Sequence, residues 1–167
     1  MVAQGGHDST VSDSSTLFAN AREANIESTI AMVEDVLIQL GHFVNDCRET
    51  PPSEGSHSWR VSKGSATIRV SLIDRHEEVR LRAVSVVMTL TPKVDERKLF
   101  RRLLTINAGE IQGSAFALRG KRVLLVSERS TLDLDRSEVL ELIQSAQDYA
   151  DHYDDTLIGE FGGKRGG

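Results

Sequence analysis

The chain is poor in cysteine and in long apolar segments, and each shortage excludes a class of protein. The single cysteine, Cys47, rules out an internal disulfide framework and a multi-cysteine zinc site. Unbroken apolar runs, such as residues 123–126, are far shorter than the roughly 20 residues that a membrane-spanning helix needs. Residues 1–6 also lack the basic and apolar regions of a signal peptide. We therefore expect a cytoplasmic protein with a reduced thiol and no membrane contact.

The composition is typical of one globular domain. The chain has 167 residues, of which 39% are hydrophobic and 27% charged, enough to bury a core without a disulfide or a metal. Its net charge of −5 disfavours a general affinity for nucleic acid or anionic membranes. Arginine supplies 15 of the 20 basic residues, so the positions of the arginines become informative.

Motifs for catalysis or metal binding are missing from the sequence. The histidines are His7, His42, His57, His76 and His152. No two of them have the spacing of a helical metal site. Cys47 has no base beside it, and Phe116 replaces the second glycine that a nucleophile elbow around Ser114 requires. Asp133 and Asp135 are better explained by the start of a helix than by a metal site. We therefore expect no enzyme, no catalytic residue, no metal site and no cofactor.

Polar composition marks both ends of the chain as tails around one domain. Residues 1–15 contain few apolar side chains and residues 159–167 contain five glycines, so we expect a disordered N-terminal tail and a flexible C-terminal tail. The domain then covers residues 16–158. Within it, apolar side chains recur at helical spacing in residues 25–40, 94–106 and 135–157. Asn25 and Asp135 are the expected N-caps of the first and last helices, and Gly41 is the expected end of the first.

Alternating apolar and polar residues predict five strands. They cover residues 59–62, 66–72, 79–90, 114–118 and 122–128, joined by connections too short for a parallel crossover. The resulting order is α-β-β-β-α-β-β-α. This order predicts an α+β fold with one antiparallel sheet and helices packed on it.

The apolar alternation changes parity within the third strand. Val79, Leu81 and Ala83 alternate with polar residues, whereas Val84, Val86 and Met88 continue one position out of step. A β-bulge near Ala83, or burial of both faces, explains such a change. Since an uncovered apolar patch usually marks an interface, we predict a homodimer that uses Val84, Val86 and Met88.

Arginines share one face of the predicted sheet. The register that buries the apolar strand residues sends Arg60, Arg69, Arg80 and Arg82 to the opposite face. Few acids share these strands, so we expect the compensating charge to come from an acidic partner. The alternatives are a solvated polar face, and an anion or single-stranded nucleic acid, which the net charge of the chain disfavours.

Several segments resemble the YbjN family of bacterial proteins, which share the fold of type III secretion chaperones. They are the helix that ends on Asn107 after residues 103–106, the Gly113-Ser114-Ala115-Phe116 opening of the fourth strand, residues 123–126, and the last helix with Tyr149 and Tyr153. The resemblance covers about residues 26–157. It implies a non-enzymatic role, because members are described as sensory-transduction regulators and the fold is used by dimeric chaperones.

Together, the patterns and the resemblance predict a non-catalytic protein-interaction module, a chaperone-like or regulatory adaptor. The expected partner is another protein that carries an acidic segment. The alternative is an accessory protein that binds anions or single-stranded nucleic acid on the arginine face.

Overall fold

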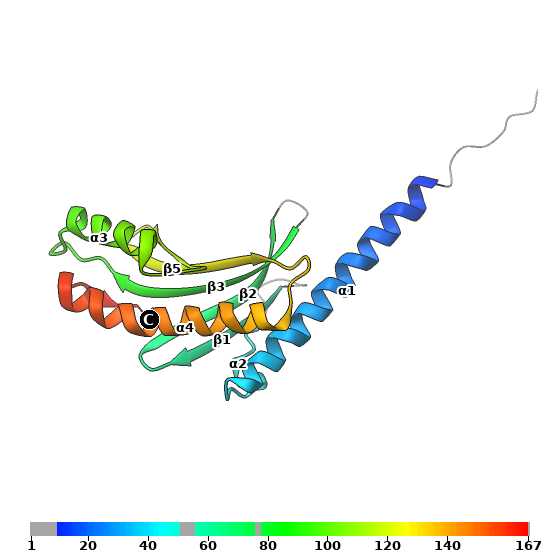
Figure 1. The fold of residues 1–167 in the computed structure, drawn as a ribbon, viewed down its shortest axis with the longest axis horizontal. Coiled ribbons are helices and arrows are strands. Elements are labelled where there is room, and N and C mark those ends of the chain that lie inside the picture. Colours follow the sequence, from blue (N-terminus) through cyan, green and yellow to red (C-terminus); the bar gives the residue numbers. More distant parts are fainter. Residues whose placement is uncertain (1–9, 51–55, 76–77, 167) are drawn as a thin grey trace, which may run out of the picture.

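The computed structural model describes residues 10–50, 56–75 and 78–166, which form an α+β fold around one antiparallel sheet (Figure 1). The helices are α1 (Thr10–Gln39), α2 (Val44–Cys47), α3 (Glu96–Gly109) and α4 (Arg136–Phe161). The strands are β1 (His57–Lys63), β2 (Ala66–Arg75), β3 (Glu78–Thr89), β4 (Ala115–Arg119), β5 (Arg122–Ser130) and β6 (Lys164–Arg165). The order across the sheet is β1-β2-β3-β5-β4, and β6 pairs with β3. The predicted order of elements is confirmed, with α2 and β6 added to it.

One face of the sheet carries the core. Val61, Ile68, Ser85, Leu125 and Phe116 lie opposite one another on neighbouring strands, and all five are buried. The helix α4 crosses this face, and α1 and α3 contribute to the same apolar cluster (Figure 1). Ile143 of α4 is fully buried, as its place in the apolar stripe predicts. We call the opposite side of the sheet the open face, because none of the described helices packs on it.

The first helix begins much earlier than its apolar pattern predicts. It starts at Thr10 rather than at Asn25, and its N-terminal half projects away from the sheet (Figure 1). Asn25 is therefore not an N-cap. Its side chain donates to the Thr131 carbonyl (2.8 Å) and accepts from the Thr131 hydroxyl (2.6 Å), which ties the helix to the loop before α4. The predicted end is confirmed, since Gly41 adopts the left-handed conformation with φ 86°.

The parity change in β3 has a different origin from a bulge near Ala83. Ser85 occupies a buried position on the core face, so the alternation continues unbroken and sends Val84 and Val86 to the open face. The bulge lies further on, between Val86 and Met88. It returns Met88 to the core, where the side chain is fully buried.

The ends of the domain also differ from the predicted tails. Residues 1–9 lie outside the described part of the chain, whereas residues 10–15 belong to α1. At the other end, α4 continues to Phe161, and Lys164 and Arg165 form the short strand β6. The glycines of this segment therefore serve a turn and a close backbone contact, and not a free tail alone. None of the described helices is long and apolar enough to cross a membrane.

Candidate functional site

The register of the sheet places the four predicted arginines together on the open face. Arg60 lies opposite Arg69, and Arg69 lies opposite Val84, so the three side chains share one side of the sheet. Arg80, Arg82 and Val84 occupy every second position along β3, so the two arginines point to the same side as Val84. The four guanidinium groups thus border a common surface of β1, β2 and β3.

Glu49 neutralises the two arginines at the β1 edge. Its carboxylate lies 2.8 Å from Arg60 and 2.6 Å from Arg69. The residue follows α2, and its backbone N–H donates to the Ser58 carbonyl (2.9 Å), which fixes it beside β1. Burial opposes ionisation of Glu49, but hydrogen bonds from the two arginines outweigh that effect, and its pKa falls below the ordinary value.

Glu128 neutralises the arginines of β3. It lies directly opposite Arg82 on β5, with its carboxylate 2.8 Å from Arg80 and 3.5 Å from Arg82. Glu78 adds a second carboxylate 3.0 Å from Arg80. The expectation that few acids compensate these arginines is therefore wrong. The compensating groups come from the chain itself, and two of the three are on the strands.

The centre of the open face is apolar. Val84 and Val86 of β3 are half-buried there, and Leu124 of β5, opposite Val86, is only 4% exposed. Around them lies a shallow hollow of about 390 Å³, which Arg60, Arg69 and Arg82 help to line. Met88, the third residue of the predicted interface, is in the core and does not reach this surface.

Two further arginines line the hollow and were not among the predicted site residues. Arg119 and Arg122 face each other across the β4–β5 turn, and both are exposed. Among the described residues, neither guanidinium has an ion pair or a hydrogen-bond partner. Their sequence signal was available, because Arg122 is two positions before Leu124 and Arg119 is two after Ala117. The local pattern does not show that β5 lies beside β3, and it is this strand order that brings the two arginines to the open face.

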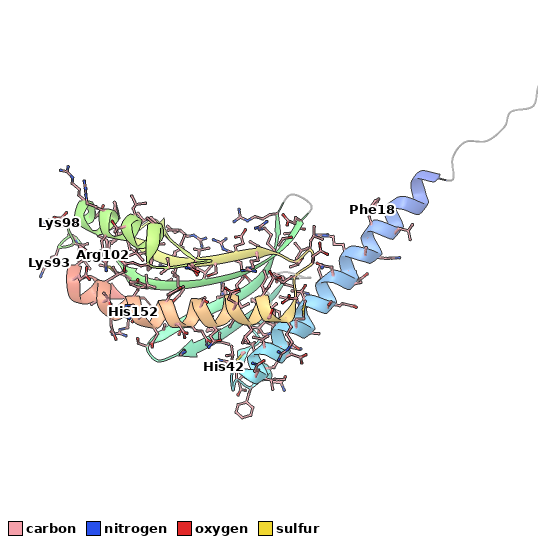
Figure 2. All side chains as sticks on the ribbon, viewed as in Figure 1. Phe18, His42, Lys93, Lys98, Arg102 and His152 are labelled. Atoms are coloured by element: carbon pink, nitrogen blue, oxygen red, sulfur yellow. The ribbon has the colours of Figure 1, made fainter. Side chains whose placement is uncertain are left out.

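Side chains that could bind a metal do not gather among the residues that the structure describes. The search of those residues finds no set of three or more histidine, cysteine or acidic side chains that could hold a metal ion. Cys47 is buried, and burial together with the nearby Asp46 raises the pKa of its thiol. His42 lies 3.2 Å from the Gln147 side chain, and the His152 ring packs edge-on against the Tyr153 ring. Figure 2 labels both histidines, with His152 on α4. The contacts of these three residues are thus with neighbouring side chains of the fold.

A second cavity lies beside the projecting part of α1. It measures about 720 Å³ and is lined by Phe18 and Arg22 of that helix, with Val79 and Leu132 on the other side. Figure 2 shows Phe18 on the projecting half of α1, where its side chain is 76% exposed. Its charged lining residues are Arg22 and Asp74, which pair with each other, and Glu78, which also contacts Arg80 at the border of the open face.

A sheet with helices on one side and an apolar, arginine-bordered surface on the other is typical of a module that binds other proteins. Comparison with known families agrees with that class. The model of TY-Chap1, described as T3SS (YopN, CesT) and YbjN peptide-binding chaperone 1, matches residues 27–166. The chain belongs to this family and is a peptide-binding chaperone domain. The predicted resemblance to the YbjN proteins and the type III secretion chaperones is therefore confirmed.

Among solved structures, the chain is similar to the type III secretion chaperone SycH of Yersinia pestis, determined in complex with a stable fragment of YscM2. The two are 20% identical, with a TM-score of 0.45 over 72% of this chain and 94% of that chain. No curated protein matches the sequence.

Proposed function

We propose that the chain binds an extended, acidic segment of a client protein across its open face. One observation carries the proposal: Arg119 and Arg122 have no carboxylate partner among the described residues and lie beside the apolar hollow around Leu124. A guanidinium binds a carboxylate through two parallel hydrogen bonds, so these residues favour aspartate or glutamate. The hollow takes the apolar side chains of the same segment.

The four predicted arginines have two different parts in this proposal. Arg60 and Arg69 have side chains that are 56% and 57% exposed, so they remain contact residues at the β1 border of the face. Arg80 and Arg82 are only 29% and 17% exposed and lie against Glu128. We assign them the positioning of that carboxylate, and not direct capture of the client.

The test uses charge reversal at the two unpaired arginines. Arg119→Glu with Arg122→Glu should weaken binding of a labelled acidic peptide by about 10-fold or more, because each position changes from attraction to repulsion. The matched control is Arg97→Glu with Arg101→Glu on α3, which makes the same charge change at exposed positions away from the face. Fluorescence anisotropy measures both. Equal weakening in the two double variants would show that only net charge matters and would refute the site.

Salt dependence separates a peptide from the nucleic-acid alternative. Exposed charges are screened over roughly 8 Å at physiological ionic strength, so peptide binding should weaken moderately as salt rises. A single-stranded oligonucleotide would instead lose about 0.7 log units of affinity per decade of salt for each phosphate neutralised. The family assignment supports the peptide. Tight, steeply salt-dependent binding of the oligonucleotide alone would favour the alternative.

We also propose that Val84 and Val86 support a homodimer when no client is bound. Both valines are half-buried on an uncovered face, which a second copy would cover. Light scattering at micromolar concentrations should give the dimer mass, and Val86→Asp should reduce it to the monomer mass. A dimer that survives this substitution places the contact elsewhere. The cytoplasmic location, the regulatory role and the lack of catalytic activity stay predictions.

A further inference from the structure

The last described residues fold back onto the sheet. After Phe161, Gly162 and Gly163 adopt φ values of 74° and 100°, a backbone conformation that side chains disfavour, and the chain reverses. Lys164 and Arg165 then pair antiparallel with Thr89 and Met88 of β3. Because β5 already pairs with these two residues on one side, β6 lies on the side of β2, beyond the first residue of that strand. The segment thus extends the sheet beside β3, at the place where β2 has already ended.

An acidic row on α4 holds the arginine of this segment. Arg165 lies 3.3 Å from the Asp154 carboxylate and also contacts Asp155. The Asp154 side chain is only 4% exposed, and its Oδ2 accepts from the Ser65 hydroxyl at 2.8 Å. Its other oxygen, Oδ1, is buried and has no hydrogen-bond partner within the described residues. A buried carboxylate that is short of donors favours a cationic partner.

Glycines on both sides of the basic pair allow the close approach. A Cβ on Gly163 would press against the Met88 side chain and the Thr89 carbonyl. A Cβ on Gly166 would overlap the Val86 carbonyl. Larger residues at these two positions would clash with β3, most severely in place of Gly166, where the contact is with backbone. The surface therefore selects both the charge and the backbone of its occupant.

The contacts that retain the segment are few. β6 has two residues, Lys164 is exposed without an ion-pair partner among the described residues, and the Arg165 side chain is 45% exposed. Ordering each residue of such a segment costs about 1–2 kcal/mol of backbone entropy. Segments with so few buried contacts open locally far more readily than the core strands.

We propose that Met88, Thr89, Asp154 and Asp155 form a second peptide site, which takes an extended segment with arginine between glycines. Residues 162–166 occupy this tail site in cis and give way to a competing segment of the same kind, which adds to β3 as a strand. The tail site and the arginines of the open face use different side chains. Either proposal can therefore fail while the other stands.

The test measures competition in the full-length chain. The probe is a fluorescein-labelled peptide with the sequence of residues 161–167, followed by anisotropy. Arg165→Glu removes the internal competitor, because it places a carboxylate against Asp154 and Asp155. The matched control is Lys164→Glu, which makes the same charge change one residue earlier, on a side chain that has no ion pair with any residue the structure describes.

We expect Arg165→Glu to bind the probe about 10-fold or more tightly than the wild type and Lys164→Glu, since a tethered competitor acts at millimolar effective concentration. Adding Asp154→Asn to Arg165→Glu should abolish that gain. Equal probe affinity in all variants, or a gain that persists without Asp154, would overturn the site. Should Arg165→Glu fail to fold, Gly166→Val replaces it, because a side chain at this position clashes with the Val86 carbonyl and expels the segment. Tighter probe binding that depends on Asp154 would again support the site, and unchanged binding would overturn it.

Discussion

Asn107 protects the exposed edge of the sheet, and its removal should measurably destabilise the domain. β4 is the last strand on its side, so the backbone groups of Phe116 that point away from β5 have no neighbouring strand. The Asn107 side chain replaces that neighbour. Its amide donates to the Phe116 carbonyl at 3.2 Å, and its oxygen accepts from the Phe116 N–H at 2.7 Å. Phe116 itself is buried and packs edge-on against Tyr153, with ring centroids 5.3 Å apart.

The expected magnitude follows from the two hydrogen bonds. Each contributes a net of about 0.5–1.5 kcal/mol, so Asn107→Ala should lower the free energy of unfolding by about 1–3 kcal/mol. For a domain of this size, a loss of about 2 kcal/mol lowers the melting temperature by about 4–8 °C. The unprotected edge should also increase aggregation at high concentration, because unpaired strand edges associate with other chains.

The control is Asn20→Ala. Asn20 is exposed on α1 and has no hydrogen bond in the described structure, yet the substitution raises helix propensity as it does at Asn107 in α3. Urea denaturation of the two variants therefore isolates the contribution of the edge contact. A difference between them smaller than about 0.5 kcal/mol would refute the idea that Asn107 replaces a strand.

Three further predictions concern the core, the thiol and acid stability. Leu142→Ala should cost about 2–5 kcal/mol in denaturant melts, because the side chain is 5% exposed at the centre of the α4 stripe; a loss under about 1 kcal/mol would contradict this packing. Cys47→Ser should leave peptide affinity unchanged, since burial raises the pKa of the thiol and keeps it protonated; loss of binding at unchanged stability would reveal a reactive cysteine. Glu49→Gln should cost about 1–2 kcal/mol at pH 7. Because the folded-state pKa of Glu49 is lowered, its contribution is present above the ordinary glutamate pKa and is lost as pH falls. The two stabilities should therefore converge as the pH falls through the lowered folded-state pKa of Glu49, and a constant difference would exclude ionisation as the cause.

Most of the fold could be predicted from local patterns in the sequence. The five main strands alternate with a period of two, and α4 has both its apolar stripe and its capping box at Asp135, where the carboxylate accepts from the Glu138 N–H at 2.9 Å. Gly41 and Gly64 mark a helix end and a hairpin turn, and both adopt positive φ. Such signals depend on residues within one turn of a helix or one pair in a strand, so a single sequence contains them completely.

The candidate site depended on pairings that no local pattern contains. The alternation in β2 and β3 predicted which arginines share a face, but their partners Glu49 and Glu128 come from a loop and from a strand far along the chain. Arg119 and Arg122 belong to the face because β5 pairs with β3 on one side and with β4 on the other.

The two ends of the domain show the same limit. Residues 10–15 are polar and suggest a tail, yet they belong to a helix that Asn25 joins to Thr131 across 106 positions. The glycine-rich segment also suggests a tail, yet residues 164–165 form a strand. They pair with β3, and Arg165 forms an ion pair with Asp154. The strand periodicity, the Asp135 cap and the turns at Gly41 and Gly64 were therefore determined by the sequence alone. The tertiary structure decided which charges are neutralised, which of the described arginines lack a partner and where residues 10–24 and 162–166 lie, because those outcomes depend on contacts between residues distant in sequence.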